Sequence, residues 1–216
     1  MSISAVLKSP RPSKAPGTMT LSRLLIAARR KLPGWDSRNW LRIRQIESFT
    51  AFLKDHQDLD VLEISPAKGA PWRALCKTYT SVAYPDFDVC EHVLPRQFGI
   101  VIADQVLEHV AKPADAVRNI HAMLRPGGHA MIATPFLFRV HPRPHDYYRW
   151  TEEGLRQLLT EGGFFSEAIR TASWGNEACA RAHIGGAVKD YGFRRNLSNN
   201  PEYPLIVWAF ASKPAV

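Results

Sequence analysis

The chain has 216 residues, which is enough for one sizeable hydrophobic core and too few for two ordinary enzymatic domains. Its apolar fraction of 45% and charged fraction of 22% are those of an ordinary globular protein, which excludes a mainly disordered or membrane-embedded chain. The net charge of +8 belongs to residues 1–50, where Lys and Arg far outnumber the two acids, Asp36 and Glu47.

The basic N-terminal region limits the partners that we expect. Its basic residues are not interleaved with aromatic ones, which disfavours a nucleic-acid partner, and contact with a membrane surface or an acidic protein stays open. No apolar run is long enough to span a bilayer. The three cysteines, Cys76, Cys90 and Cys179, are widely spaced and odd in number, which predicts a reducing, cytoplasmic location without disulfides or a cysteine metal site.

The N-terminal quarter divides into a tail and a helical extension. Residues 1–18 contain Pro10, Pro12 and Pro16 and are predicted to be a disordered basic tail. Residues 19–56 are predicted to be a helical extension, with one amphipathic helix over 19–31 and a second over 38–56. The remaining residues, 57–216, form the predicted main domain.

Strand and helix patterns alternate through the main domain. Strands are predicted over 59–65, 79–84, 98–104, 129–134, 165–172 and 204–211. Helices are predicted over 71–77, over 113–124 with RPGG at 125–128 as its stop, and over 151–161 between Thr151 and Gly162-Gly163. This order predicts an α/β fold, a Rossmann-like three-layer sandwich with a mostly parallel seven-strand sheet. Ligands of such sheets bind at the carboxyl ends of the strands, which here follow Ile64, Tyr84, Asp104 and Thr134.

Four segments in order resemble the type 11 methyltransferase domain family, a branch of the class I S-adenosylmethionine-dependent methyltransferases. They are VLEISPAKG (61–69), FGIVIADQVLEHV (98–110), MLRPGGHAMIATP (123–135) and HDYYRWTEEGLRQLLTEGGF (145–164). The resemblance implies S-adenosylmethionine as the cofactor, held at the ends of the first strands.

The resemblance also implies which residues bind the cofactor. Glu63 matches the family's carboxylate, and Ser65 and Gly69 belong to the loop that is glycine-rich in the family. Ser65, Pro66 and Ala67 replace the first glycines, and only glycine freely adopts a positive φ. Asp86 and Asp88 are candidates for the ribose or adenine, although both can equally be ordinary turn residues. Asp104 and Gln105 end the buried strand on the expected cofactor side.

The loop 141–151, HPRPHDYYRWT, is the candidate acceptor site. Pro142 and Pro144 exclude a helix there, so the spacing of His141 and His145 does not indicate a metal pair, and we expect no metal. His145 and Asp146 are the first candidates for a general base, and His141 is the third. The predicted substrate-binding residues are Tyr147, Arg149, Trp150, Trp174 and Asn176, with a core position as the alternative for Trp174. His109 is predicted to hold its turn through hydrogen bonds.

These patterns predict a methyltransferase acting on oxygen or nitrogen of a small-molecule or glycan-type acceptor. The unusual cofactor loop leaves a second function open, that of a catalytically inactive binding or regulatory protein with the same fold. A third possibility, a nucleic-acid or membrane-surface protein acting through residues 8–44, would show salt-sensitive binding. A dinucleotide oxidoreductase is disfavoured because the G-x-G-x-x-G pattern does not follow the first strand.

Overall fold

The computed structural model describes residues 28, 31–66, 70–142, 144–184, 191–192 and 196–215. The tail predicted over 1–18, nearly all of the helix predicted over 19–31, and Gly69 lie outside these residues. The strands are β1 (Asp60–Ile64), β2 (Thr78–Val82), β3 (Phe98–Asp104), β4 (Leu124–Pro135), β5 (Ile169–Trp174) and β6 (Ile206–Ser212). The helices are α2 (Ile43–Asp55), α3 (Pro113–Met123), α4 (Glu152–Glu161) and α5 (Glu177–Ile184). Short 3-10 helices are η1 (Trp40–Arg42), η2 (Pro71–Leu75), η3 (Leu107–His109) and η4 (Ser166–Ala168).

The six strands form one sheet in the order β2-β1-β3-β4-β6-β5. Strands β1 to β4 are parallel, and β6 runs antiparallel to both of its neighbours. The mostly parallel α/β sheet is confirmed, while the expected count of seven strands is wrong for the residues described. Between β2 and β3 the chain forms turns and irregular structure rather than a further strand.

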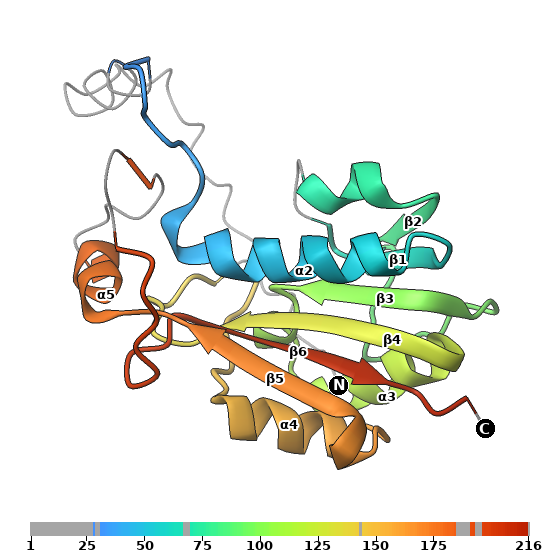
Figure 1. Ribbon diagram of the computed structural model, residues 1–216. Helices are drawn as coiled ribbons and strands as arrows, with labels where there is room; N and C mark the ends of the chain where they lie inside the picture. Colours follow the sequence, from blue (N-terminus) through green and yellow to red (C-terminus); the bar gives the residue numbers. More distant parts are fainter. Residues whose placement is uncertain are drawn as a thin grey trace, which may run out of the picture.

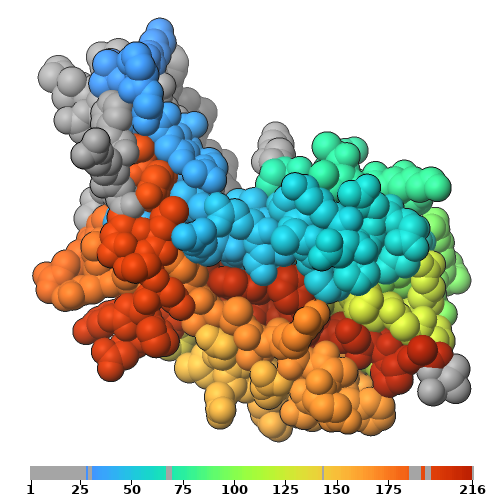
Figure 2. All heavy atoms as spheres, in the orientation of Figure 1, coloured from blue at the N-terminus to red at the C-terminus, as the bar shows by residue number. Residues whose placement is uncertain are grey.

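Helices cover both faces of the sheet (Figure 1). On one face, Phe49 and Leu53 of α2 pack with Trp72 of η2 against the strands. On the other face, α3 and α4 supply most of the helical side chains of a second core, including Ile120 and Leu155. Figure 2 shows α2 as a continuous layer across the molecule, with atoms of the C-terminal strand beneath it and α4 on the opposite side. The second predicted helix, over 38–56, is confirmed as η1 and α2. Most of its buried apolar residues belong to the core that also contains Trp72.

Local signals set the ends of α4 as predicted. The Thr151 hydroxyl accepts a hydrogen bond from the amide of Gly154, and the helix ends at Gly162, with Gly163 at φ +105°. Two predicted boundaries are wrong. Residues 125–128 lie inside β4 rather than between α3 and a later strand, and the strand expected over 165–172 begins at Ile169, after η4. No helix among the described residues is long and apolar enough to cross a membrane.

Candidate active site

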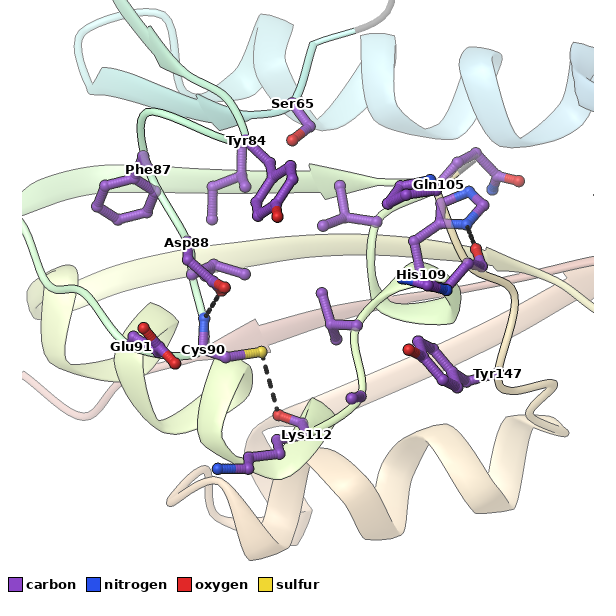
Figure 3. A pocket seen from close by; sticks show the side chains of 17 residues that line it. Ser65, Tyr84, Phe87, Asp88, Cys90, Glu91, Gln105, His109, Lys112 and Tyr147 are labelled. Atoms are coloured by element: carbon purple, nitrogen blue, oxygen red, sulfur yellow. Dashed lines mark hydrogen bonds between the residues drawn. The ribbon is translucent and has the colours of Figure 1, made fainter. Parts of the chain in front are cut away.

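A cavity of about 450 Å³ lies at the carboxyl ends of β1, β2 and β3. This volume is within the range of small-molecule sites, and the position is where ligands bind in open α/β sheets. Figure 3 shows Ser65 and Tyr84 on one side of the cavity, with Gln105, His109 and Tyr147 on another. The lining residues are Ile64, Ser65, Tyr84, Phe87, Asp88, Val89, Cys90, Glu91, Gln105, Val106, His109, Val110, Ala111, Lys112, Pro144, His145 and Tyr147.

Two residues with left-handed backbone conformations mark the ends of β1 and β3. Ser65 has a φ of +51° and Gln105 a φ of +59°, which few residues other than glycine adopt without strain. The backbone amide of Ser65 donates to the carbonyl of Val82, and the backbone amide of Gln105 donates to the carbonyl of Ala133. Both residues line the cavity. Ser65 thus has a conformation that glycine adopts most readily.

The turn after β2 forms a second wall of the cavity. Tyr84 and Phe87 contribute aromatic rings there, and the Asp88 carboxylate accepts a hydrogen bond from the amide of Cys90. Asp88 therefore lies where a cofactor-binding acid was predicted. Asp86 is exposed and does not line the cavity, so of the two candidates only Asp88 is in place.

Glu63 lies on the opposite face of the sheet, under α2. Its Oε2 accepts hydrogen bonds from Tyr79 at 2.5 Å and Trp72 at 3.2 Å. The side chain is fully buried, and burial raises the pKa of its carboxyl. Glu63 does not line the cavity, although its strand ends there.

Asp104 forms an ion pair with Arg42 on the face of the sheet that also carries Glu63. Both of its oxygens lie 2.5 Å from Nη2 of Arg42, and Arg42 also donates to Gln45 of α2. Only 2% of the Asp104 side chain is exposed. The pair ties the N-terminal helical segment to the end of β3, and Asp104 does not line the cavity.

The loop over 141–151 places its candidate residues in different environments. His145 and Tyr147 line the cavity, with their rings 5.3 Å apart. The Asp146 side chain is 2% exposed and forms a two-point ion pair with Arg149, which is the main cause that holds the pKa of the Asp146 carboxyl well below its usual range. Neither Asp146 nor Arg149 lines the cavity. Of the two leading candidates for a base, His145 is therefore the one at the cavity.

Trp150, Trp174 and Asn176 have structural contacts. Trp150 stacks on Tyr148 and packs against the core of the α3 and α4 face. Trp174 is 2% exposed within the other core, which is the alternative predicted for it. The Asn176 side chain donates to the backbone carbonyls of Asn196 and Ser198, which follow α5, and accepts from the amide of Cys179 within α5. None of the three lines the cavity.

Glu108 and His109 connect η3 to this loop. His109 Nδ1 donates to the carbonyl oxygen of His145 at 2.5 Å, and the amide of Tyr147 donates to the carbonyl of Glu108. The hydrogen-bonding role expected of His109 is present, but its partner belongs to the 141–151 loop. The Glu108 side chain is fully buried, and burial raises the pKa of its carboxyl to about 8. His141 lies beside it, and burial lowers the pKa of its imidazole.

Sequence reasoning missed several cavity residues, above all Tyr84, Phe87, Cys90 and Lys112. Tyr84 and Phe87 lie in the turn that follows β2. Their position at the carboxyl edge of the sheet could therefore be predicted from the strand assignment. Lys112 and Cys90 meet through a hydrogen bond from the Cys90 thiol to the Lys112 carbonyl, as Figure 3 shows. These two residues are distant in the sequence, and nothing in their local patterns indicated that they lie together.

Comparison with known sequences assigns the chain to a protein family. Residues 37–174, more than half of the chain, match the model of a methyltransferase domain, and the chain belongs to that family. A ubiquinone biosynthesis O-methyltransferase of Pseudomonas aeruginosa (strain LESB58) is 32% identical over 89 residues, 39% of this chain and 37% of that protein. One from Stutzerimonas stutzeri (strain A1501) is 31% identical over 100 residues, 44% of this chain and 39% of that protein. The matched region thus spans well under half the length of these relatives.

Solved structures agree on the fold. The N-methyltransferase NodS of Bradyrhizobium japonicum WM9 has a TM-score of 0.52 at 16% identity, covering 81% of this chain and 97% of that one. Its structure in complex with S-adenosyl-L-homocysteine has a TM-score of 0.51 at 14% identity and covers 82% and 89%. A methyltransferase of Archaeoglobus fulgidus has a TM-score of 0.51 at 15% identity and covers 78% and 94%.

Proposed function

We propose that this protein transfers a methyl group from S-adenosylmethionine to an oxygen or nitrogen atom of a small-molecule or glycan-type acceptor. The observation that carries the proposal is the cavity at the ends of β1, β2 and β3 in a chain of the methyltransferase family. Within that cavity, Ser65 and Gln105 have the left-handed conformations of strand ends at which the backbone itself approaches a ligand.

The residues of the cavity fit the cofactor. The aromatic rings of Tyr84 and Phe87 suit the flat purine, and Ser65 and Gln105 offer polar side chains to the ribose and amino-acid groups. The carboxylates of Asp88 and Glu91 favour a ligand with a positive charge. When bound, the cofactor supplies an electrophilic methyl group on a sulfonium.

His145 is the residue we propose to remove the proton of the acceptor. It lies at the cavity beside Tyr147, and its backbone carbonyl is fixed by His109. An imidazole at hydrogen-bond distance from an acceptor hydroxyl or ammonium is the usual general base. Asp146 is a weaker candidate because Arg149 holds its carboxylate, leaving it a poor proton acceptor. The position of Tyr147 makes it a candidate for acceptor contact.

Calorimetric titration with S-adenosylhomocysteine tests the cofactor site. We expect saturable binding that Tyr84→Ala weakens by about 5- to 150-fold, since stacking of a base on an aromatic ring contributes about 1–3 kcal/mol. Tyr84 is 64% exposed, so its removal leaves the core intact. Phe165→Ala is the matched control, because Phe165 is an exposed aromatic residue that does not line the cavity. Absence of binding at millimolar concentration would exclude the proposed function.

A binding protein without catalysis is the second candidate function. It is favoured by Glu63 and Asp104, whose carboxylates are held by Tyr79, Trp72 and Arg42 on the far face of the sheet. The second candidate requires neither cofactor binding nor turnover, whereas the first requires both, so turnover separates them. We expect release of S-adenosylhomocysteine with at least one member of a panel of phenols, sugars and amines, reduced at least tenfold by His145→Ala. Binding without turnover across such a panel would favour the second candidate.

A further inference from the structure

Three side chains beside the cavity converge on one point. Glu108 Oε1 lies 3.7 Å from Nε2 of His109 and 3.9 Å from Nε2 of His141. The three potential ligand atoms all lie within 4.8 Å of one another. These distances are too long for direct hydrogen bonds. Neighbouring ligands that each lie about 2.1 Å from one metal ion are about 3–3.5 Å apart and never more than about 4.2 Å apart, so the three side chains would have to draw closer together to share an ion.

The Glu108 carboxyl needs a partner that the described residues do not supply. Its side chain is fully buried, and neither of its oxygens has a hydrogen-bond partner within the part of the chain that the structure describes. A buried carboxyl without a partner is unfavourable unless a proton or a cation accompanies it. Because Oε1 faces two imidazole nitrogens, the surroundings match a set of metal ligands better than an apolar core.

Both histidines are oriented as metal ligands. His109 Nδ1 faces the carbonyl of His145, and His141 Nδ1 lies 3.1 Å from Oδ2 of Asp146 and 3.2 Å from the carbonyl of Arg139. Since a carbonyl oxygen only accepts, the proton of each neutral ring belongs on Nδ1, which leaves a free lone pair on Nε2, the nitrogen that lies 3.7 Å from Glu108 Oε1 in His109 and 3.9 Å from it in His141. Histidines that bind metals commonly donate their other N–H to a carbonyl or carboxylate in this way.

Asp146 and Arg149 give this arrangement an outer layer. Oδ2 of Asp146 also accepts from the backbone amide of His141 at 2.8 Å, and Arg149 binds both Asp146 oxygens. The carboxylate is therefore fixed, and with it the ring of His141. His109 comes from η3 and His141 from the loop that follows β4, so a shared ion would join these two segments beside the cavity.

We propose that Glu108, His109 and His141 bind one divalent first-row transition-metal ion, with two imidazoles and one carboxylate as its protein ligands. Zinc and non-haem iron sites use this ligand set, whereas Mg²⁺ and Ca²⁺ prefer oxygen ligands to imidazole nitrogen. His109 lines the cavity, and the segment fixed by His141 includes the cavity residues His145 and Tyr147. The ion would therefore hold one wall of the cavity in place. The site differs from the His141 and His145 pair that the sequence excluded.

Metal titration of the full chain tests the site without any methyl transfer. The tag-free protein is stripped with a chelator and titrated with Zn²⁺ against a chromophoric competitor, and separately with Co²⁺ monitored by visible absorption. We expect one ion per chain, a Co²⁺ spectrum typical of mixed nitrogen and oxygen ligands, and a rise in the thermal midpoint with Zn²⁺. Mg²⁺ at the same concentration should not compete.

Variants locate the ion. Glu108→Gln and His141→Gln should each weaken Zn²⁺ binding at least tenfold, and Asp146→Asn should weaken it about 10- to 100-fold through the orientation of His141. His92→Gln is the control, because His92 is an exposed histidine outside the cluster, and it should leave the affinity unchanged. Circular dichroism checks that each variant is folded.

The outcomes are distinct from those of the cofactor titration, because no step uses S-adenosylmethionine. A wild-type chain that binds no Zn²⁺ or Co²⁺ would overturn the proposal, whatever the variants do. So would binding that folded Glu108→Gln and His141→Gln variants retain, since the ion would then be adventitious. Stoichiometric binding lost in these two variants and kept in His92→Gln would establish the site.

Discussion

At the residue scale, Glu63 links a buried charge to stability. The hydrogen bonds from Tyr79 and Trp72 favour the charged form of its carboxyl, but burial outweighs them and raises the pKa above the ordinary value of 4.5. Between the ordinary and the raised pKa, the folded chain holds a proton that the unfolded chain has lost. The contribution of Glu63 to stability is therefore fully present below pH 4.5 and is lost as the pH rises through the pKa of the folded state.

This sign gives a prediction for urea unfolding measured from pH 4 to pH 8. In the wild type, the free energy of unfolding should fall by at most about 1.4 kcal/mol per pH unit as the pH rises through that window. Glu63→Gln should not show this fall, because its side chain does not titrate. Its amide oxygen still accepts from Tyr79 and Trp72. Glu153→Gln, at an exposed position in the first turn of α4, is the matched control. Equal pH dependence in wild type and Glu63→Gln would contradict this assignment.

Ser65 carries backbone strain at the cavity. Its φ of +51° disfavours β-branched side chains, so Ser65→Val should cost about 1–2 kcal/mol of stability. Ser65→Gly relieves the strain but adds freedom to the unfolded chain, so its net effect should be below about 1 kcal/mol. Ser81→Val in β2 is the control, because an exposed strand position accepts valine readily. Equal urea midpoints for the two valine variants would show that Ser65 is not strained.

At the scale of elements, contact between α3 and α4 depends on a glycine. A β-carbon at Gly162 would overlap the Val117 side chain, whereas one at Gly154 would meet only atoms at 3.4 Å or beyond. We expect Gly162→Ala to destabilise the fold by about 1–3 kcal/mol through overpacking. Gly154→Ala in the first turn of α4 should be neutral or slightly stabilising. Thermal or urea unfolding compares the two, and similar stabilities would argue against this packing.

The same scale shows what the sequence could predict. The strand over 98–104 was predictable because all seven of its residues are buried, which leaves an unbroken apolar run ending at an acid. The glycines in 125–128 suggested a turn, but Gly128 lies within β4, where the backbone of the neighbouring strand β3 approaches closely. A β-carbon there would lie about 3 Å from the carbonyl oxygens of Phe98 and Gly99. Only the tertiary contact distinguishes these two uses of glycine.

The site was predictable to the level of the sheet edge and no further. Alternation along β1 and β3 places Glu63 and Asp104 on the face covered by α2, and the sequence did not indicate which face borders the cavity. Ser65 and Gln105 line the cavity and have positive φ angles, which cannot be predicted from a serine or a glutamine in the sequence. The convergence of Glu108, His109 and His141 depends on how the loop after β4 packs on η3, which local patterns do not encode.

At the scale of the whole molecule, ligand binding should appear as stability. A ligand at 100 times its dissociation constant adds about 2.7 kcal/mol to the free energy of unfolding. For a chain of this size, we expect S-adenosylhomocysteine to raise the thermal midpoint by about 5–10 °C. Tyr84→Ala should reduce this shift and Phe165→Ala should preserve it. An unchanged midpoint at saturating ligand would contradict binding to the folded state.

The most direct test of the central claim is a crystal structure of the chain with S-adenosylhomocysteine. The account predicts the ligand in the cavity at the ends of β1, β2 and β3, with its purine against Tyr84 and Phe87 and its amino-acid part near Ser65 and Gln105. Ligand density at another place, or crystals grown at saturating ligand with none in this cavity, would contradict the assignment of the cavity as the cofactor site.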